Sequence, residues 1–207
     1  MMLSRLTLKS TRAAKSWVAN AYRVHQRLMM GCAGDPRMLF RIEEMTEVGA
    51  IEGLQRILVQ SQRVPEWDAV FADLGVVDLP IETREYQVAP DRGAVYRFRL
   101  LANPTVTRVR PGEKRGVRLG LLQEVDQRAW LRRKLEESGL VPADVAVKDL
   151  GLRRSQKSDG SSQTHQAVLY DGHGTCTEAG ALMQAVTAGI GPAKGYGFGL
   201  LSIARLV

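Results

Sequence analysis

The 207-residue chain has few cysteines and no long hydrophobic stretch. Cys32 and Cys176 are its only cysteines, and neither stands in a Cys-x-x-Cys pair or beside histidines at metal-ligand spacing, so we expect two buried thiols and no metal site. No apolar run approaches the roughly 18 to 20 residues that a membrane span needs, and the first ten residues lack the apolar core of a signal peptide. These absences predict a cytoplasmic protein that has no membrane partner.

Positive charge is what the chain has in excess. The formal net charge is +7 and the pI is near 9.7. Residues 92–157 hold 16 Lys and Arg against 7 Asp and Glu, so the basic surface is local. Such a surface favours a polyanionic partner, nucleic acid first. The alternative is a basic surface that is merely solvated, because basic surfaces alone are common.

Hydrophobic periodicity predicts an α+β fold with the same order of elements in each half. In the first half we expect a strand over 3–8, a helix over 21–30 capped by Asn20, strands over 38–45 and 54–60 around a glycine-containing turn, a helix over 65–74 and a strand over 81–88. In the second half we expect a long strand over 95–109, a helix over 121–137, strands over 145–152 and 163–170, a helix over 177–188 and a strand over 198–206.

Each half therefore follows the βαββαβ order of a ferredoxin-like (RRM-like) domain. Residues 89–93, Ala-Pro-Asp-Arg-Gly, have the composition of a turn and mark the boundary between them. We predict two tandem ferredoxin-like domains, over residues 1–90 and 91–207.

Three segments carry candidate nucleic-acid contacts. The polar stretch 155–162 joins two predicted strands as a hairpin loop, with Arg153, Arg154 and Lys157 at its base and tip. An ordinary solvated hairpin fits that composition equally well. Arg128, Arg132 and Arg133 recur at helical spacing opposite Leu131 and Leu135, where they could face phosphates or only solubilise the helix.

The third segment, residues 189–199, contains five glycines between a predicted helix and the last strand. Glycines let a phosphate approach the backbone amides, and Lys194 could add a point charge. A structural turn from helix to strand explains the pattern as well. The order of residues is not that of a Walker phosphate-binding loop. The candidate contacts in this segment are Gly191, Lys194 and Gly195.

The stretch GIGPAKGYGFGLLSIARL, residues 189–206, resembles the glycine-rich C-terminal signature of CRISPR repeat-processing endoribonucleases. The CasE branch, from type I-E systems, also has a helix with Tyr-x-x-His, which is similar to Tyr22-Arg23-Val24-His25 in this chain. Residues 58–61, 98–104 and 129–135 add further similarity in the same order along the chain.

This resemblance implies a pair of ferredoxin-like domains that bind the hairpin of CRISPR repeat RNA and cut its backbone at the base of the stem. It implies a reaction without metal or cofactor that leaves a 2′,3′-cyclic phosphate. The expected partners are the repeat RNA hairpin, the mature guide RNA that is retained after the cut, and the other subunits of the Cascade complex.

The resemblance also implies that Tyr22 and His25 are catalytic. Imidazole titrates near pH 6.5 and can exchange protons in the cell, while a phenol with a pKa near 10 is better suited to hydrogen bonding or to orienting the 2′-hydroxyl. Some members place a cation just beyond the histidine; either Arg27 takes that role in this chain or no cation is used. His165 and His173 match no catalytic position of the family and are reserve candidates.

Without the resemblance, Tyr22 is a side chain at the edge of the core and His25 is a surface histidine. Two other functions fit the same fold and charge. The first is a non-catalytic RNA-binding scaffold subunit of a CRISPR ribonucleoprotein, with an inert Tyr22 and His25. The second is a regulatory or ribosomal RNA-binding protein whose glycine-rich segment is only a turn. Cleavage of the repeat RNA in EDTA separates both from the nuclease.

Overall fold

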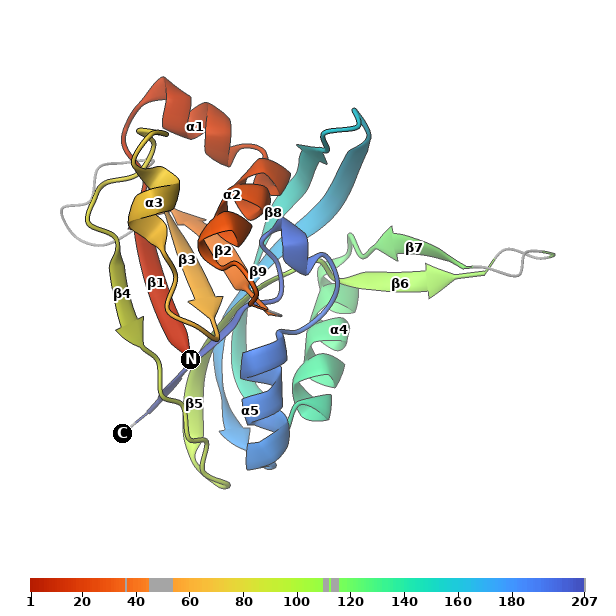
Figure 1. Ribbon diagram of the computed structural model, residues 1–207. Coiled ribbons are helices and arrows are strands. Elements are labelled where there is room, and N and C mark those ends of the chain that lie inside the picture. The colour runs from red at the N-terminus through yellow and green to blue at the C-terminus, as the bar shows by residue number, and fades with distance from the viewer. Residues whose placement is uncertain (36, 45–53, 110–111, 113–115, 207) are drawn as a thin grey trace. The chain divides into compact units, whose positions relative to one another are not determined.

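The structure of the protein, a computed structural model, describes residues 1–35, 37–44, 54–109, 112 and 116–206 (Figure 1). The chain divides into two compact units. The first comprises Met1–Gln87, Arg154–Gln163 and Lys194–Gly197, and the second comprises Val88–Arg153, Thr164–Ala193 and Phe198–Val207. Two short segments from late in the chain thus belong to the first unit. The division into domains over 1–90 and 91–207 stays a prediction.

The first unit contains a four-stranded sheet in the order β2-β3-β1-β4. Its elements are β1 (Met2–Thr7), α1 (Arg12–Val18), α2 (Ala21–Gly31), β2 (Leu39–Glu44), β3 (Gln55–Ser61), α3 (Trp67–Phe71) and β4 (Glu82–Glu85). The strands pair antiparallel, with Leu6 opposite Ile57 and Phe40 opposite Val59. This strand order is that of the predicted ferredoxin-like pattern.

Apolar side chains of α2 hold that helix on the sheet. Val24 and Leu28 are fully buried and join the core cluster that also contains Leu6, Ile57 and Val59. Burying one such aliphatic side chain contributes roughly 1.5 to 3 kcal/mol. Figure 1 shows α2 and α3 against one face of the sheet. The helix face that bears Tyr22 and His25 is therefore fixed by the neighbouring apolar stripe.

The second unit contains a four-stranded sheet in the order β10-β5-β9-β8 and a two-stranded sheet of β6 and β7. Its elements are β5 (Val95–Ala102), β6 (Thr105–Arg108), β7 (Val117–Gly120), α4 (Glu124–Glu137), most of the hairpin β8 (Leu140–Gln156) and β9 (Ser162–Cys176), α5 (Ala179–Ala188) and β10 (Leu201–Arg205). The larger sheet again has the ferredoxin-like order, which confirms the predicted fold class.

Helix α4 packs on this second sheet through its aromatic and aliphatic side chains. Trp130, Leu131 and Leu135 are buried, and the ring of Trp130 stacks on that of Tyr170 with centroids 6.4 Å apart. The Tyr170 hydroxyl donates to the backbone oxygen of Gln127 over 3.2 Å, so the phenol is satisfied inside the core. The prediction that Trp130, Leu131 and Leu135 point inward is confirmed.

Several predicted elements differ from the structure. The single long strand over 95–109 is wrong, because β5 ends at Ala102 and Pro104, which has no N–H for a ladder, separates it from β6. Helix α1 and strand β7 were not predicted. Strands β8 and β9 are much longer than the predicted 145–152 and 163–170. The glycine-containing turn before residue 54 lies outside the described residues.

The two cysteines agree with the expectation of buried thiols. Cys32 and Cys176 are buried, unbridged thiols. Burial, and next the carboxylate of Asp35, raise the pKa of Cys32 to about 12, so this thiol is unreactive at neutral pH. No helix in the described part of the chain is long and apolar enough to cross a membrane. Within the same residues, no group of three or more His, Cys, Asp and Glu side chains could hold a metal ion.

Candidate active site

The site begins at the capped N-terminus of α2 in the first unit. The backbone N–H of Tyr22 donates to the Asn20 side-chain oxygen over 3.2 Å, as expected of an asparagine N-cap. Tyr22 and His25 lie three residues apart and so share one side of the first turns. The remaining free amides and the helix dipole make this end attractive to an anion.

The imidazole of His25 is held between two elements. Its ring stacks on Phe40 of β2, with centroids 6.0 Å apart and an interplanar angle of 13°. Its Nε2 atom faces Gly195, where a Cβ atom would lie only 3.4 Å away. Nδ1 is buried and has no hydrogen-bond partner among the described residues. Burial lowers the pKa of His25, so the free protein carries a neutral imidazole at pH 7.

The short 3₁₀ turn η1 (Lys194–Tyr196) lies beside α2 and brings a second phenol to the site. The rings of Tyr22 and Tyr196 have centroids 6.2 Å apart. Burial lowers the pKa of Lys194, and the positive charge of Arg37 lowers it further. Lys194 and Arg37 repel each other, and a bound anion would relieve that repulsion. The site thus contains an imidazole and two phenols next to a position that suits a phosphate.

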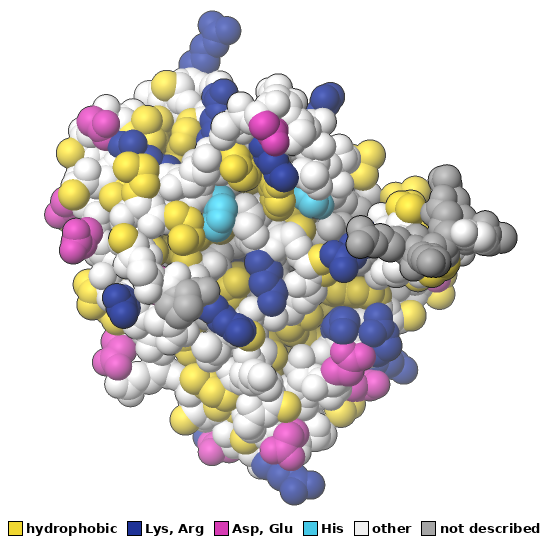
Figure 2. Space-filling model, turned by 45° about the vertical axis from the view of Figure 1, so that its right-hand side comes forward, with side chains coloured by type: hydrophobic (Ala, Val, Ile, Leu, Met, Phe, Trp, Pro, Cys, Tyr) yellow, Lys and Arg dark blue, Asp and Glu magenta, His cyan; other side chains and the backbone are white. Residues whose placement is uncertain are grey.

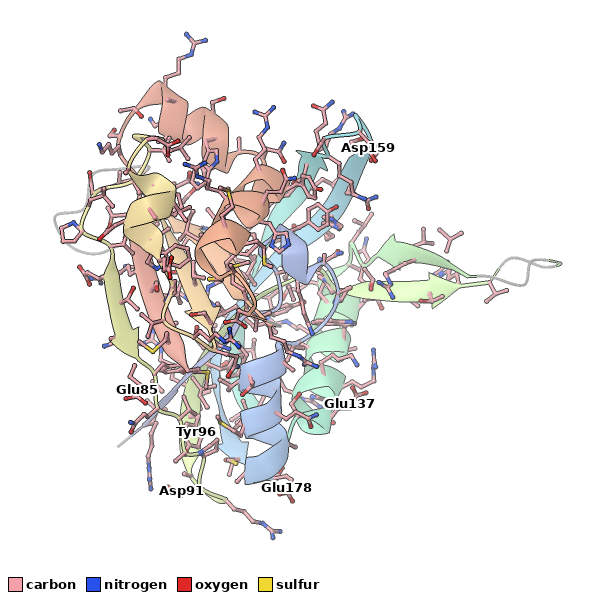
Figure 3. The ribbon with its side chains drawn as sticks, in the orientation of Figure 1. Glu85, Asp91, Tyr96, Glu137, Asp159 and Glu178 are labelled. Atoms are coloured by element: carbon pink, nitrogen blue, oxygen red, sulfur yellow. The ribbon has the colours of Figure 1, made fainter. Side chains whose placement is uncertain are left out.

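The tip of the β8–β9 hairpin, where Asp159 is labelled in Figure 3, contacts the same helix. The Asn20 side-chain amide donates to the backbone oxygen of Gln156 over 3.0 Å, and the Gln26 amide donates to Ser158 Oγ over 3.4 Å. These bonds bring the turn that contains Lys157 next to the start of α2. The Arg154 guanidinium donates to Ser162 Oγ over 3.2 Å, across the hairpin.

Arg27 does not share the His25 face of α2. Two residues correspond to a rotation of about 200° around a helix, and the Arg27 guanidinium forms an ion pair with Asp73 instead. Its side chain is 20% exposed. Arg27 therefore lies on the far side of the helix from the imidazole and is already paired with a carboxylate. The expectation that it could stabilise charge next to His25 has no support in this geometry.

The arginines of α4 in the second unit are not equivalent. Arg128 pairs with Glu124 over 2.7 Å and donates to the backbone oxygen of Val145, and Arg133 pairs with Glu137 over 3.2 Å. Arg132 is exposed and forms no ion pair within the described residues. Intrahelical carboxylates thus neutralise two of the three predicted RNA contacts. Arg153, half-buried, lies on β8 in the second unit.

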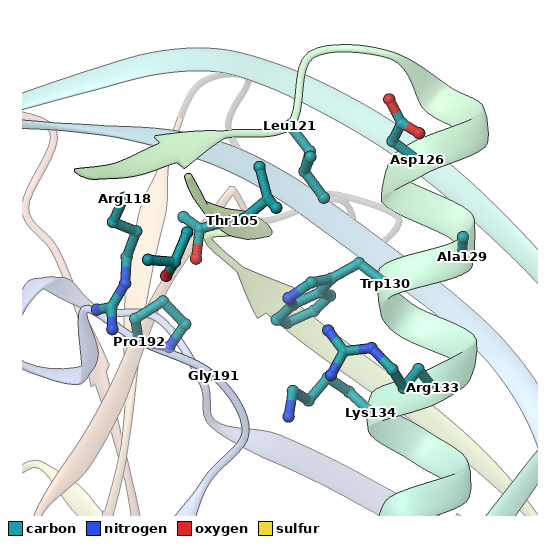
Figure 4. Close-up of a pocket in the computed structure, with 12 residues that line it drawn as sticks. Thr105, Arg118, Leu121, Asp126, Ala129, Trp130, Arg133, Lys134, Gly191 and Pro192 are labelled. Carbon is teal, nitrogen blue, oxygen red and sulfur yellow. The ribbon is translucent and has the colours of Figure 1, made fainter. Parts of the chain in front are cut away.

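A cavity of about 850 Å³ opens beside α4 in the second unit. Figure 4 shows Trp130, Arg133 and Lys134 of α4 on one side and Arg118 of β7 with Pro192 on the other. Its full lining is Thr105, Val106, Thr107, Arg118, Leu121, Asp126, Ala129, Trp130, Arg133, Lys134, Gly191 and Pro192. The lining has three cations and one carboxylate, and two of the cations, Arg133 and Lys134, already pair with Glu137.

Gly191 lines that cavity and is a glycine for reasons of packing. Its φ of +82° is in the left-handed region, and a Cβ atom would lie 3.0 Å from the Trp130 ring. Both features disfavour a side chain at this position, and neither involves RNA. Figure 2 shows Lys and Arg side chains spread over the face drawn and histidine side chains reaching the surface there.

The structure brings Tyr22, His25, Lys194 and Gly195 together within the first unit, with Lys157 in the hairpin turn that contacts α2. It adds three residues that the sequence did not single out: Phe40, Tyr196 and Gln26. The aromatic residue within the glycine-rich segment was a signal for Tyr196. No local pattern indicates that Phe40 would meet His25, because 15 residues of chain separate them.

Comparisons with known proteins agree with one another. The model of a family described as CRISPR associated protein matches residues 1–205. The CRISPR-associated endoribonuclease Cse3 of Thermus thermophilus is 30% identical over 223 residues, which cover 99% of this chain and 100% of Cse3. The Cascade subunit CasE of Escherichia coli K12 is 32% identical over 93% of this chain and 96% of CasE. A solved structure of Cse3 bound to a 19-nucleotide RNA has a TM-score of 0.83 at 29% identity, covering 99% and 100% of the two chains.

Proposed function

Because this chain belongs to the CRISPR-associated protein family, we propose that it is a metal-independent endoribonuclease that binds the stem-loop of CRISPR repeat RNA and cuts the precursor at the base of the stem. The name of its relative Cse3 states the same class of activity. The observation that carries the proposal is the placement of Tyr22 and His25 on one side of the start of α2, with His25 Nε2 directed at the turn that begins with Lys194.

The reaction needs no water and no metal. The 2′-oxygen forms a bond to the adjacent phosphorus while the bond from phosphorus to the 5′-oxygen breaks. The 2′-hydroxyl loses a proton and the 5′-oxygen gains one, so the products are a 2′,3′-cyclic phosphate and a 5′-hydroxyl. At neutral pH the 2′-hydroxyl keeps its proton and is a weak nucleophile, and the 5′-oxygen would leave as an unstable alkoxide. A group that exchanges protons must therefore assist, and such assistance accelerates reactions by about 10² to 10⁴.

His25 is that group in the proposed mechanism. Its lowered pKa keeps the imidazole neutral in the free protein, and the negative charge of a bound RNA phosphate would raise the pKa again. Tyr22 orients the 2′-hydroxyl or donates to a phosphate oxygen. Lys194, facing the charge of Arg37, gives the phosphate a cation close to the imidazole.

We assign RNA binding to two further regions and the glycine-rich segment. The residues are Arg128, Arg132 and Arg133 of α4, Arg153, Arg154 and Lys157 of the hairpin, and Gly191, Lys194 and Gly195. Arg27 contributes only if a phosphate replaces Asp73. In terms of the predicted domains, residues 1–90 carry the catalytic helix and residues 91–207 carry the basic helix, the hairpin and the glycine-rich segment. A-form stems favour recognition by shape and phosphate contacts.

The proposal extends to the product. The protein keeps the mature guide RNA after the cut and delivers it to the Cascade complex, in which its relative CasE is a subunit. One protein molecule then processes one guide, so rapid turnover is unnecessary. The site of action is the cytoplasm, where the precursor transcript is made.

The test is incubation of the purified protein with its own repeat RNA in EDTA. A single cut at the base of the stem, with a cyclic phosphate on the 5′ product, is the expected result. A protein that binds the hairpin tightly and leaves it whole is the scaffold subunit. A protein that neither binds the hairpin selectively nor cuts it is an RNA-binding protein of another kind. Both latter outcomes contradict the proposed activity.

A further inference from the structure

Gly195 lies against the Nε2 edge of the His25 ring. A Cβ atom at this position would lie 3.4 Å from Nε2, 3.5 Å from Cδ2 and 3.8 Å from Cε1 of His25. These distances are ordinary van der Waals contacts, so a methyl group would fit without pushing the ring away. It would instead cover the nitrogen.

The backbone gives no reason for a glycine at this position. Gly195 is the middle residue of η1, and its φ lies outside the left-handed region that Gly191 and Gly197 occupy at +82° and +83°. An alanine would adopt this conformation and would restrict the unfolded chain. The missing side chain therefore serves the space beside the imidazole rather than the turn.

The rest of the ring is immobilised. Phe40, which is fully buried, stacks on one face of His25. Gly197 in turn lies against Phe40, since a Cβ atom there would be 3.0 Å from its Cε2. Nδ1 points into the protein without a hydrogen-bond partner in the described residues. A buried Nδ1 cannot meet the RNA, which leaves Nε2 as the ring nitrogen for proton exchange.

We infer that Gly195 is a positioning residue whose missing side chain keeps Nε2 of His25 open to the RNA, and that Nε2 is the nitrogen that exchanges a proton with the reacting RNA oxygen. This inference rests on the proposed nuclease function. As a base, the unprotonated Nε2 accepts the proton of the 2′-hydroxyl; as an acid, the protonated ring gives its Nε2 proton to the 5′-oxygen. Nδ1 stays inside in both cases. Gly195 thereby acts on the chemistry, and this role replaces the RNA contact assigned to it above, while stem binding depends on the basic side chains.

The test compares Gly195→Ala with Gly180→Ala. Gly180 lies in α5, also has no left-handed φ, and a Cβ atom there meets nothing closer than 4.0 Å. Three properties are measured for the full-length variants: the single-turnover cleavage rate with saturating repeat hairpin in EDTA, the Kd for the hairpin, and the midpoint of thermal unfolding. Nitrogen NMR of the RNA-free protein reports the tautomer and titration of His25, assigned with His25→Gln.

Gly195→Ala should cleave on the order of 100-fold more slowly, at the lower end of what acid–base assistance supplies. Its hairpin Kd should stay within about threefold and its unfolding midpoint should not fall, because the methyl group fits the fold. In the NMR titration the pKa of His25 should move further down, because the methyl group removes water from Nε2. Gly180→Ala should match the wild type in cleavage, affinity and His25 titration.

A shift in the His25 titration of Gly195→Ala would come from the covering of Nε2 and from no other titratable group. The elements that contact His25 carry these other titratable groups: Tyr22, Arg23 and Arg27 on α2, Lys194 and Tyr196 on η1, and Arg41, Glu43 and Glu44 on β2. Arg41 and Glu43 pair with each other on the other face of the sheet. Gly195→Ala alters none of them, so a shift reports the covering of Nε2.

Three results overturn the inference. The first is cleavage by Gly195→Ala within threefold of the wild type. The second is a loss of affinity as large as the loss of rate, which makes Gly195 only a binding contact. The third is an unchanged His25 titration. If the wild type itself does not cut RNA, the proposed function fails, and the NMR titration alone decides whether Gly195 controls access to Nε2.

Discussion

The N-cap of the catalytic helix offers a sharp test of how α2 is held. Asn20 makes two separable hydrogen bonds, because its oxygen accepts the N–H of Tyr22 and its amide donates to the backbone oxygen of Gln156 in the hairpin tip. Asn20→Ala removes both. Asn20→Asp keeps the accepting oxygen and removes only the donor. Comparing the two variants therefore separates the stability contributed by the N-cap from that contributed by the hydrogen bond to the hairpin.

The expected free energies follow from these contacts. Loss of an N-cap side chain costs about 1 kcal/mol. The exposed hydrogen bond to Gln156 contributes about 0.5 kcal/mol, the low end for a neutral bond. Asn20→Ala should therefore lower the free energy of unfolding by about 1.5 kcal/mol and Asn20→Asp by about 0.5 kcal/mol. Thr11→Ala is the control, because Thr11 caps α1 by accepting the N–H of Ala14 and should cost about 1 kcal/mol.

Urea denaturation of the RNA-free proteins, followed by circular dichroism, measures these differences. The cleavage rate should fall in Asn20→Ala beyond what Thr11→Ala shows, because only α2 carries the catalytic side chains. Equal destabilisation by Asn20→Ala and Asn20→Asp would refute the cap as the main contribution. So would a Thr11→Ala variant that loses stability while Asn20→Ala does not.

Two further outcomes follow from charge. Burial lowers the pKa of both His25 and His165 from 6.5, so the unfolded chain takes up protons that the folded protein does not. The free energy of unfolding should fall as the pH drops below 6.5, and His25→Gln should weaken this dependence on pH. If denaturation curves of His25→Gln show the same dependence as the wild type, the His25 imidazole is not buried. In RNA-binding titrations over a range of salt, Arg132→Ala should lower the slope of log Kd against log salt by about 1, and Arg133→Ala should lower it less because Glu137 already pairs with Arg133. Equal effects would contradict this ranking.

Local patterns were sufficient to predict the ferredoxin-like order of both halves, because apolar periodicity and turn residues are local properties. They failed where a local signal competes with long-range pairing. Gly172 and Gly174 look like strand breakers, yet both lie within β9, where a Cβ atom would be 2.3 Å from Asp144 O and 2.6 Å from Val141 O. The glycines are there because the neighbouring strand approaches closely.

The site shows the same division. Tyr22 and His25 share a helix, so their proximity follows from a spacing of three residues. The partners of His25 come from β2 and from residues 194–197, and only the folded sheet brings these segments to α2. The glycine-rich segment was recognised as unusual, but composition could not tell that Gly191 packs on Trp130 while Gly195 faces an imidazole. Arg27 looked suitable in sequence and is directed to Asp73 by the turn of the helix.

The most direct measurement is cleavage of the repeat hairpin by His25→Ala in EDTA, with His173→Ala as a matched histidine control from the second unit. We predict that His25→Ala loses at least about 10²-fold in rate, while its hairpin affinity stays within tenfold, roughly 1.4 kcal/mol, and that His173→Ala cuts normally. Unimpaired cutting by His25→Ala would contradict the central role given to this imidazole.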